Sequence, residues 1–302
     1  MNYWHCLNND PIMKNSEIKD PLFLQAVEAI DAGNIPVLTQ LLSETPSLVT
    51  KRSSVPAEGY FKNPYLLWFV ADNPIRVERL PSNIVEVTKL IIGFIEKQSP
   101  VTLLKQLNYA LGLVATGKVP KDCGVQIALI DLLLEKGAST GNIVGVLAHG
   151  NPGAAKHLIG KGAPLTLTVA ICLGMKDEVN DLFLASDKVE KELALVAASF
   201  FGKADYVEYL IQHGVNVNRY PRSSSGFHSH ASALHQAVYS GSLACVKILV
   251  DAGADLSAKD KIYDGTPLGW AQYMHAGDES QSRKQSYLEI EKFLQSKLKT
   301  TL

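Results

Sequence analysis

The sequence predicts an all-α protein, a solenoid of about eight helix-turn-helix repeats joined by irregular connecting segments, here called fingers. Two observations predict this class. Segments with apolar residues at i, i+3 and i+4 occur in pairs, and many of them stop at a glycine. Such pairs also recur along the chain, and a helix pair that recurs buries its apolar face against its neighbours.

The clearest unit covers residues 232–260. Its first helix is expected to begin at Ser232 and to stop at Gly241, and its second to run from Leu243 to Ala252 and stop at Gly253. Glycine reaches the positive φ at which many helices end without a steric penalty. The two glycines therefore mark the ends of one helix pair.

The next unit opens at residues 264–271. Thr266 can cap the helix, and Pro267 suits its first position, where a missing N–H costs nothing. A second helix is expected over residues 287–296. Its many charged residues suit a terminal repeat, which must expose a polar outer face.

These segments resemble the ankyrin repeat, whose pattern is roughly TPLHxAAxxGHxxVVxxLLxxGADVN. The matching positions in the clearest unit are Leu234, His235, Ala237, Gly241, Val246, Leu249, Gly253, Ala254 and Asp255. The resemblance implies that His235 bonds the backbone of an adjoining repeat. Trp68 and Gly269 fill the same position in other repeats, so this histidine is not a repeated catalytic feature.

Positions equivalent to Leu234 can be placed along the whole chain. These anchors are Ala26, Leu67, Leu111, Ile143, Leu167, Leu195, Leu234 and Leu268. Seven steps separate the first anchor from the last, with a mean of about 35 residues, close to the ankyrin period of ~33. We therefore expect a single ankyrin-repeat domain over residues 1–302, with an N-terminal extension at residues 1–19.

The steps between anchors are uneven, and we expect the variation to fall in the fingers. The two shortest steps predict that the fingers after Gly162 and near Ala185 are stubs. Long steps predict extra finger residues, and the third repeat also gains an insertion at 118–124 between its two helices. The expected long fingers cover residues 50–63, 97–106 and 218–231.

The N-terminal half fits the general pattern less well, but it resembles a bacterial subfamily of ankyrin-repeat proteins. The segments that carry this resemblance are residues 66–74, 83–92 and 111–138, together with 264–271 near the end. The resemblance supports the fold and brings no known activity with it.

Composition excludes several classes of function. The 29 Lys and Arg residues balance 30 Asp and Glu residues, which gives a formal net charge of −1 and no electrostatic footprint for nucleic acid or an anionic membrane. No apolar run approaches the roughly 20 residues of a membrane span, and residues 1–11 lack the basic region and apolar core of a signal peptide, so we expect none. Four scattered cysteines argue against disulfides and a zinc site. We expect a cytoplasmic protein without a cofactor.

Catalytic motifs are missing from the sequence, and we predict that the chain is not an enzyme. It contains neither a GxSxG nor an HExxH motif, and residues 150–156 lack the GK[ST] ending of a phosphate-binding loop. His228 and His230 would make only half of a metal site. Two alternatives stay open. One is a small-molecule or metal-binding solenoid with a shallow pocket between His149, Cys172 and the missing fingers, and the other is an enzyme of unrecognised type.

The resemblance also points to a binding surface. In the ankyrin pattern, the two residues before the glycine that ends the first helix point into a concave groove. Early repeats carry small or polar residues there, such as Asp31 and Asp72, whereas late repeats carry aromatic and apolar ones. We expect a non-catalytic module that binds an unidentified protein. Its candidate contacts are Leu173, Phe200, Phe201, Tyr239, Tyr273 and Met274, with Arg219, Tyr220, Arg222 and Phe227 of the finger. In the alternative, the finger at 219–230 folds back and covers Phe200 and Phe201.

Overall fold

The computed structural model describes residues 13–221 and 226–300, and its regular elements in these ranges are all helices. The nearest approach to a sheet there is one isolated antiparallel bridge between Arg52 and Tyr65. The prediction of an all-α fold is confirmed. Within the same ranges, none of the helices combines the length and apolar composition of a membrane-spanning segment.

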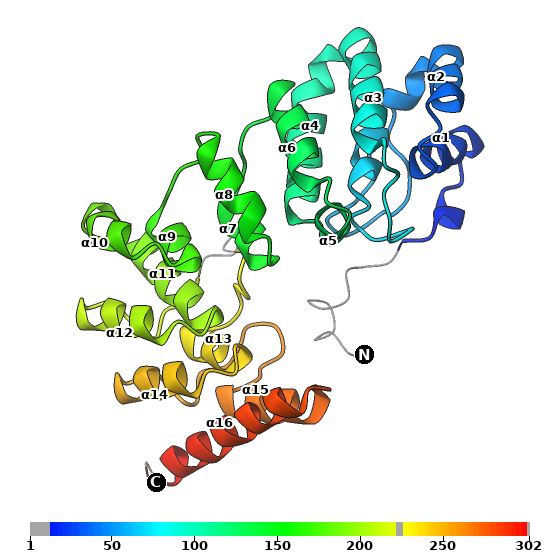
Figure 1. Cartoon of the computed structure of the whole chain (residues 1–302). Coiled ribbons are helices and arrows are strands. Elements are labelled where there is room, and N and C mark those ends of the chain that lie inside the picture. Colours follow the sequence, from blue (N-terminus) through cyan, green and yellow to red (C-terminus); the bar gives the residue numbers. More distant parts are fainter. Residues whose placement is uncertain (1–12, 222–225, 301–302) are drawn as a thin grey trace. The chain divides into compact units, whose positions relative to one another are not determined.

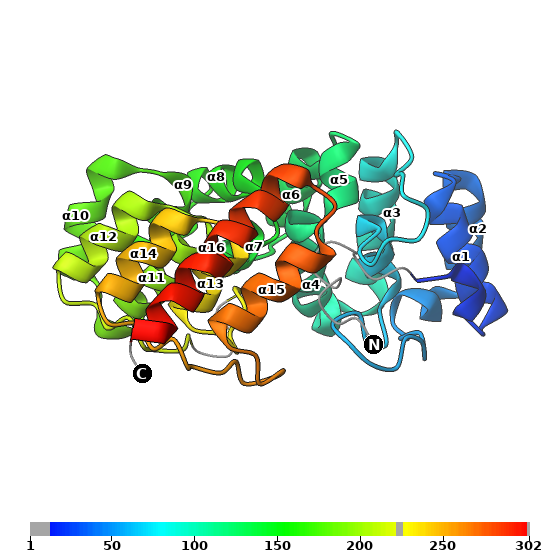
Figure 2. The ribbon, with the colours of Figure 1, turned by 90° about the horizontal axis from the view of Figure 1, so that it is seen from below.

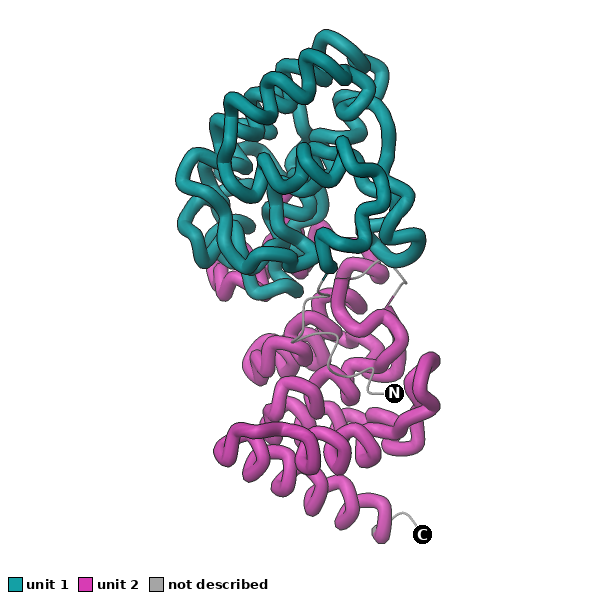
Figure 3. Tube along the Cα trace, turned by 90° about the vertical axis from the view of Figure 1, so that its right-hand side faces the viewer, with its two compact units in different colours: residues 1–163 teal, residues 164–302 magenta. Residues whose placement is uncertain are grey.

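Cα packing divides the chain into two compact units, Met1–Ala163 and Pro164–Leu302, which Figure 3 colours teal and magenta. We call them unit 1 and unit 2 and describe each by itself. The division falls at the stub finger that follows Gly162, where the sequence leaves few residues to link successive repeats.

In its described residues, unit 1 combines α-helices with three short 3₁₀ helices (Figure 1). Its elements are η2 (Asn15–Glu17), α1 (Pro21–Asp31), α2 (Ile35–Glu44), η3 (Pro46–Val49), η4 (Leu66–Ala71), α3 (Ile84–Gln98), α4 (Pro100–Thr116), α5 (Lys118–Asp122), α6 (Gln126–Glu135), α7 (Ile143–Ala148) and α8 (Pro152–Gly160). Of the expected N-terminal extension, residues 1–12 lie outside the described ranges. Met13 is buried, and its N–H donates to the carbonyl of Ile75 at 3.0 Å.

Unit 2 is more regular, with eight α-helices in its described residues. They are α9 (Leu167–Leu173), α10 (Lys176–Ala185), α11 (Lys188–Phe200), α12 (Ala204–Gln212), α13 (Ala233–Tyr239), α14 (Leu243–Asp251), α15 (Pro267–Gly277) and α16 (Gln281–Thr300). The first helices of the pairs form a row in which α9 packs on α11, α11 on α13 and α13 on α15. The second helices α12, α14 and α16 lie side by side (Figure 2).

The eight anchors fall in eight separate elements. Four of these elements lie in unit 1 and four in unit 2, and Leu67 of unit 1 lies in a 3₁₀ helix. In chain order the elements are α1, η4, α4, α7, α9, α11, α13 and α15. Each is followed along the chain by a second helix, so the spacing of apolar anchors located the helix pairs even where the local pattern is weak.

The stub fingers are observed as predicted. Only Ser186 and Asp187 separate α10 from α11, and residues 161–166 link α8 to α9 without a strand. The expected long finger at residues 97–106 is wrong: α3 ends at Gln98 and α4 begins at Pro100, so the extra residues lengthen a helix. Pro100 favours a helix start there, and the apolar stripe of α4 continues through Leu107 and Leu111, both of which are buried.

Candidate binding surface in unit 2

The ankyrin-like motif of unit 2 has the expected geometry. The His235 ring donates from Nε2 to the carbonyl of Gly265 at 3.0 Å, and its Nδ1 accepts from the Ser232 hydroxyl at 2.8 Å. Thr266 caps α15 by accepting the N–H of Gly269, and Pro267 occupies the first position of that helix. Gly241 and Gly253 have φ of +72° and +85°. His235 therefore joins two repeats, and burial lowers its pKa and keeps the ring neutral.

Sequence reasoning missed the residue that orders the finger before α15. The buried carboxylate of Asp260 accepts the N–H groups of Ile262, Tyr263 and Gly265 and the indole N–H of Trp270, at 2.7–3.0 Å. Burial alone would raise the pKa of Asp260, but these bonds outweigh it and the pKa is lowered. An aspartate just before a tight turn that ends in glycine is the signal that could have indicated this role.

Phe227 packs into the predicted groove instead of facing solvent. It is 3% exposed, and its ring centroid lies 5.1 Å from that of Phe200 and 6.0 Å from that of Phe201. Tyr239 stacks on Phe200 at 5.3 Å, and His228 lies 4.5 Å from Tyr239. The expectation that Phe227 is an exposed contact is wrong, because these rings bury it. The finger folds back on Phe200 and Phe201, as the alternative proposed.

All six predicted contacts on the first helices of successive pairs keep exposed surface; Phe200 is half-buried against Phe227 and Tyr239, and the other five lie as follows. Leu173, Phe201, Tyr239 and Met274 are half-buried, and the exposed fraction of Tyr273 is 41%. The first three lie at the ends of α9, α11 and α13, whereas Tyr273 and Met274 lie inside α15, which continues to Gly277. We call these five residues the aromatic surface.

The remaining finger residues have different surroundings. Tyr220 donates its hydroxyl to the carbonyl of Lys259 at 2.8 Å, and the Lys261 ammonium lies 4.5 Å from its ring centroid, so Tyr220 ties two fingers together. The side chain of Arg219 is 58% exposed and 3.7 Å from the Glu192 carboxylate. Arg222 lies outside the described residues.

The groups considered for metal or nucleophilic chemistry are placed as follows. His228 is buried, and burial lowers its pKa to about 4; its ring centroid lies 5.7 Å from that of His230, whose pKa burial also lowers. In the described part of the chain, no group of three or more His, Cys, Asp or Glu side chains could hold a metal ion. Burial raises the pKa of the Cys172 thiol to about 12, and Cys172 and His149 belong to different units.

Helix pairs whose first helices stack in succession define a helical repeat protein, and residues 146–260 match the family model described as ankyrin repeats (3 copies). Residues 146–260 of this chain therefore contain ankyrin repeats. The human ASB11 ankyrin repeat domain resembles it at 15% identity over 90% of this chain and 98% of that chain, with a TM-score of 0.33, too low to support an argument. No curated protein matches it. Ankyrin repeats are typically non-catalytic modules that bind other proteins.

Proposed function

We propose that this chain is a non-catalytic protein–protein interaction module that presents the aromatic surface of unit 2 to a protein partner. One observation carries the proposal: Leu173, Phe201, Tyr239, Tyr273 and Met274 recur on successive first helices and keep exposed surface. Aromatic residues and methionine are enriched where proteins bind one another, and a row of them across several repeats offers a partner an extended contact.

The finger supports this surface from within. Phe227 and His228 pack against Phe200 and Tyr239, and these contacts hold the Tyr239 ring in one orientation. A side chain that is already ordered loses less rotamer entropy when a partner covers it. The buried finger residues therefore act as supports, and the contacts are the residues that keep exposed surface.

The proposal is tested by capturing partners from a source lysate with the full chain, remaking each purified candidate and measuring its affinity directly. The variant is Phe201→Ala with Tyr273→Ala. The matched control is Leu184→Ala, because Leu184 lies on α10 in the same unit, is 74% exposed and is outside the aromatic surface.

We expect the double variant to weaken binding by more than tenfold, which corresponds to about 1.4 kcal/mol, and the control to bind like the wild type. Melting curves of all three proteins show whether the fold is kept. Equal affinity of the double variant and the wild type would refute the proposal, as would an equal loss in the Leu184→Ala control.

A further inference from the structure

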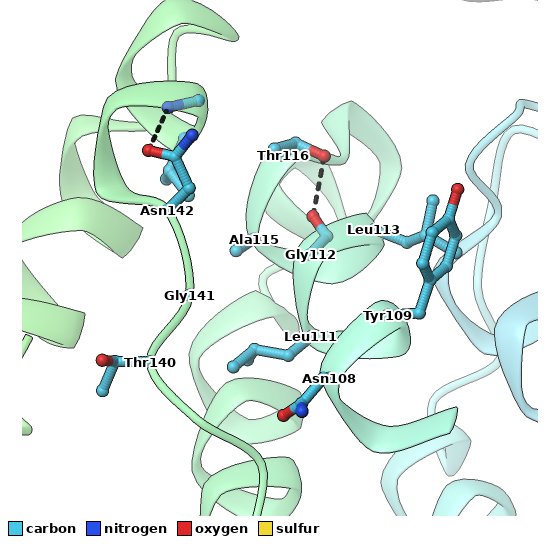
Figure 4. A pocket seen from close by; sticks show the side chains of 12 residues that line it. Asn108, Tyr109, Leu111, Gly112, Leu113, Ala115, Thr116, Thr140, Gly141 and Asn142 are labelled. Carbon is cyan, nitrogen blue, oxygen red and sulfur yellow. Dashed lines mark hydrogen bonds between the residues drawn. The ribbon is translucent and has the colours of Figure 1, made fainter. Parts of the chain in front are cut away.

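Unit 1 contains a pocket between α4 and the segment that links α6 to α7. Its volume is about 290 Å³, and Figure 4 shows Leu111 and Ala115 on the side of α4 that faces this segment. The floor is formed by the apolar side chains of Leu111, Ala115 and Val146, whose exposed fractions are 2%, 2% and 4%. Asn108, Gly112 and Gly141 form an exposed rim.

The pocket exists because residues without bulky side chains line both of its walls. An added Cβ at Gly112 would meet no atom within 4 Å, and at Gly141 the nearest atom is the Ser139 carbonyl oxygen at 4.0 Å. A cavity of ~150 Å³ can hold benzene, so this pocket has room for a group about twice that size. A large aromatic side chain fits these dimensions.

The lining also selects an uncharged occupant. It contains no carboxylate, ammonium, guanidinium or imidazole group; its side-chain polar groups are the amides of Asn108 and Asn142 and the hydroxyls of Tyr109, Thr116 and Thr140. Burying an isolated charge against such a wall costs free energy that no opposite charge offsets. The occupant must therefore be neutral where it enters the pocket.

The segment at the rim adds a preference for a peptide. Thr140 and Gly141 lie outside helices, and their backbone N–H and C=O groups make no hydrogen bond with another described residue. Asn108 holds the start of this segment, because its side-chain oxygen accepts the N–H of Ser139 at 2.8 Å. Free backbone groups beside a pocket can pair with an extended peptide whose side chain fills that pocket.

We propose that this pocket binds one large, neutral aromatic side chain of an extended peptide segment. The site belongs to unit 1 and does not depend on the function proposed for unit 2. The probe is N-acetyl-L-tryptophanamide, titrated into the full chain and followed by the NMR amide signals of Gly112, Gly141 and Gly145. Indole, which lacks the backbone amides, and N-acetyl-L-glutamic acid amide, which is charged, are titrated in parallel.

Two glycine variants separate filling of the pocket from a general effect of replacing a helical glycine. Gly112→Leu puts a side chain into the pocket. Gly93→Leu is the matched control, because Gly93 lies inside α3 of the same unit, outside the pocket, and a Cβ there also meets nothing within 4 Å.

We expect the tryptophan probe to shift the three glycine signals in a saturable way, with at least tenfold weaker binding to Gly112→Leu and unchanged binding to Gly93→Leu. Indole should bind several-fold more weakly, and the glutamate probe should not bind. No saturable shift at these glycines, equal binding to Gly112→Leu, equal binding of the glutamate probe, or indole as tight as the tryptophan probe would each overturn the proposal.

Discussion

The two units use different side chains at the same repeat position. In unit 2, His235 follows its anchor and donates to the carbonyl of Gly265, just before the next first helix. In unit 1, Trp68 follows its anchor, and its indole N–H donates at 3.2 Å to the carbonyl of Gln106, inside α4. Both rings are buried. In these two repeats, the ring at this position donates to the backbone of the next repeat, to a carbonyl before a helix in unit 2 and to a carbonyl inside a helix in unit 1.

The units also differ in how they order the segment after this position. In unit 2, uncharged backbone and indole donors surround Asp260. In unit 1, Arg76 contacts the carboxylates of Asp31 at 2.8 Å and Asp72 at 3.5 Å, and the side chain of Arg76 is 1% exposed. The less regular unit therefore depends on buried ion pairs, which are costly to disturb.

The largest expected effect comes from removing that charge. Arg76→Met would leave Asp72 buried without its cation, and burial already raises the pKa of this carboxyl. We expect a loss of about 3–5 kcal/mol of unfolding free energy, measured by denaturant titration with hydrogen exchange in unit 1.

Lys136→Met is the control, because the Lys136–Glu96 pair of unit 1 is partly exposed. It should cost about 0–1 kcal/mol. Similar losses in the two variants would show that burial does not distinguish the pairs.

The ring position itself gives the next effect. His235→Phe removes two hydrogen bonds and Trp68→Phe removes one, and each net bond contributes about 1 kcal/mol. We expect the unfolding free energy to fall by about 2 kcal/mol in the histidine variant. In the tryptophan variant it should fall by about 1 kcal/mol for the hydrogen bond, and further because the smaller ring buries less apolar surface. Calorimetry of both variants measures this. If His235→Phe left the unfolding free energy unchanged, the hydrogen bonds of His235 would not stabilise unit 2 and the comparison with Trp68 would fail.

His228 of unit 2 and Asp72 of unit 1 should respond to acid in opposite directions. The folded-state pKa of His228 is about 4, below its ordinary 6.5, so the unfolded chain binds more protons and unit 2 loses stability as the pH falls from about 6.5 to 4. The loss at pH 5 is about 2 kcal/mol. The raised pKa of Asp72 has the opposite sign and favours folded unit 1 as the pH falls.

Hydrogen exchange at pH 7 and pH 5 measures both units in one sample. His228→Phe should flatten the response of unit 2. If unit 2 of this variant lost as much stability between pH 7 and pH 5 as the wild type does, groups other than His228 would cause the loss.

The smallest effect should be a gain. Gly93→Ala and Gly112→Ala each replace a helical glycine at a position with free space around the added methyl group. Each should raise the unfolding free energy by about 0.5–1 kcal/mol, measured by thermal unfolding. A loss at either position would mean that the helix cannot accept a side chain there.

The sequence by itself determined the helix pairs and the motif of unit 2. Apolar spacing, helix-ending glycines and caps act over a few residues, so the anchors, the Thr266 cap and the stub fingers could be predicted locally. The hydrogen bond from His235 to the next repeat could be predicted from the resemblance to the ankyrin repeat, because that resemblance implies which segment is the neighbour. Arg76, Asp260 and Trp68 were not assigned these roles, because their partners depend on how loops fold back.

Only the tertiary structure decided which apolar residues keep exposed surface. The sequence gives no sign that Phe227 and Phe201 differ in burial. In the structure, Phe227 is buried against Phe200 and Phe201, whereas Phe201 stays half-exposed. The pocket beside Gly112 likewise depends on a segment about 30 residues away in the chain. Burial results from contacts between distant segments, and local periodicity does not specify how a finger folds back onto a helix.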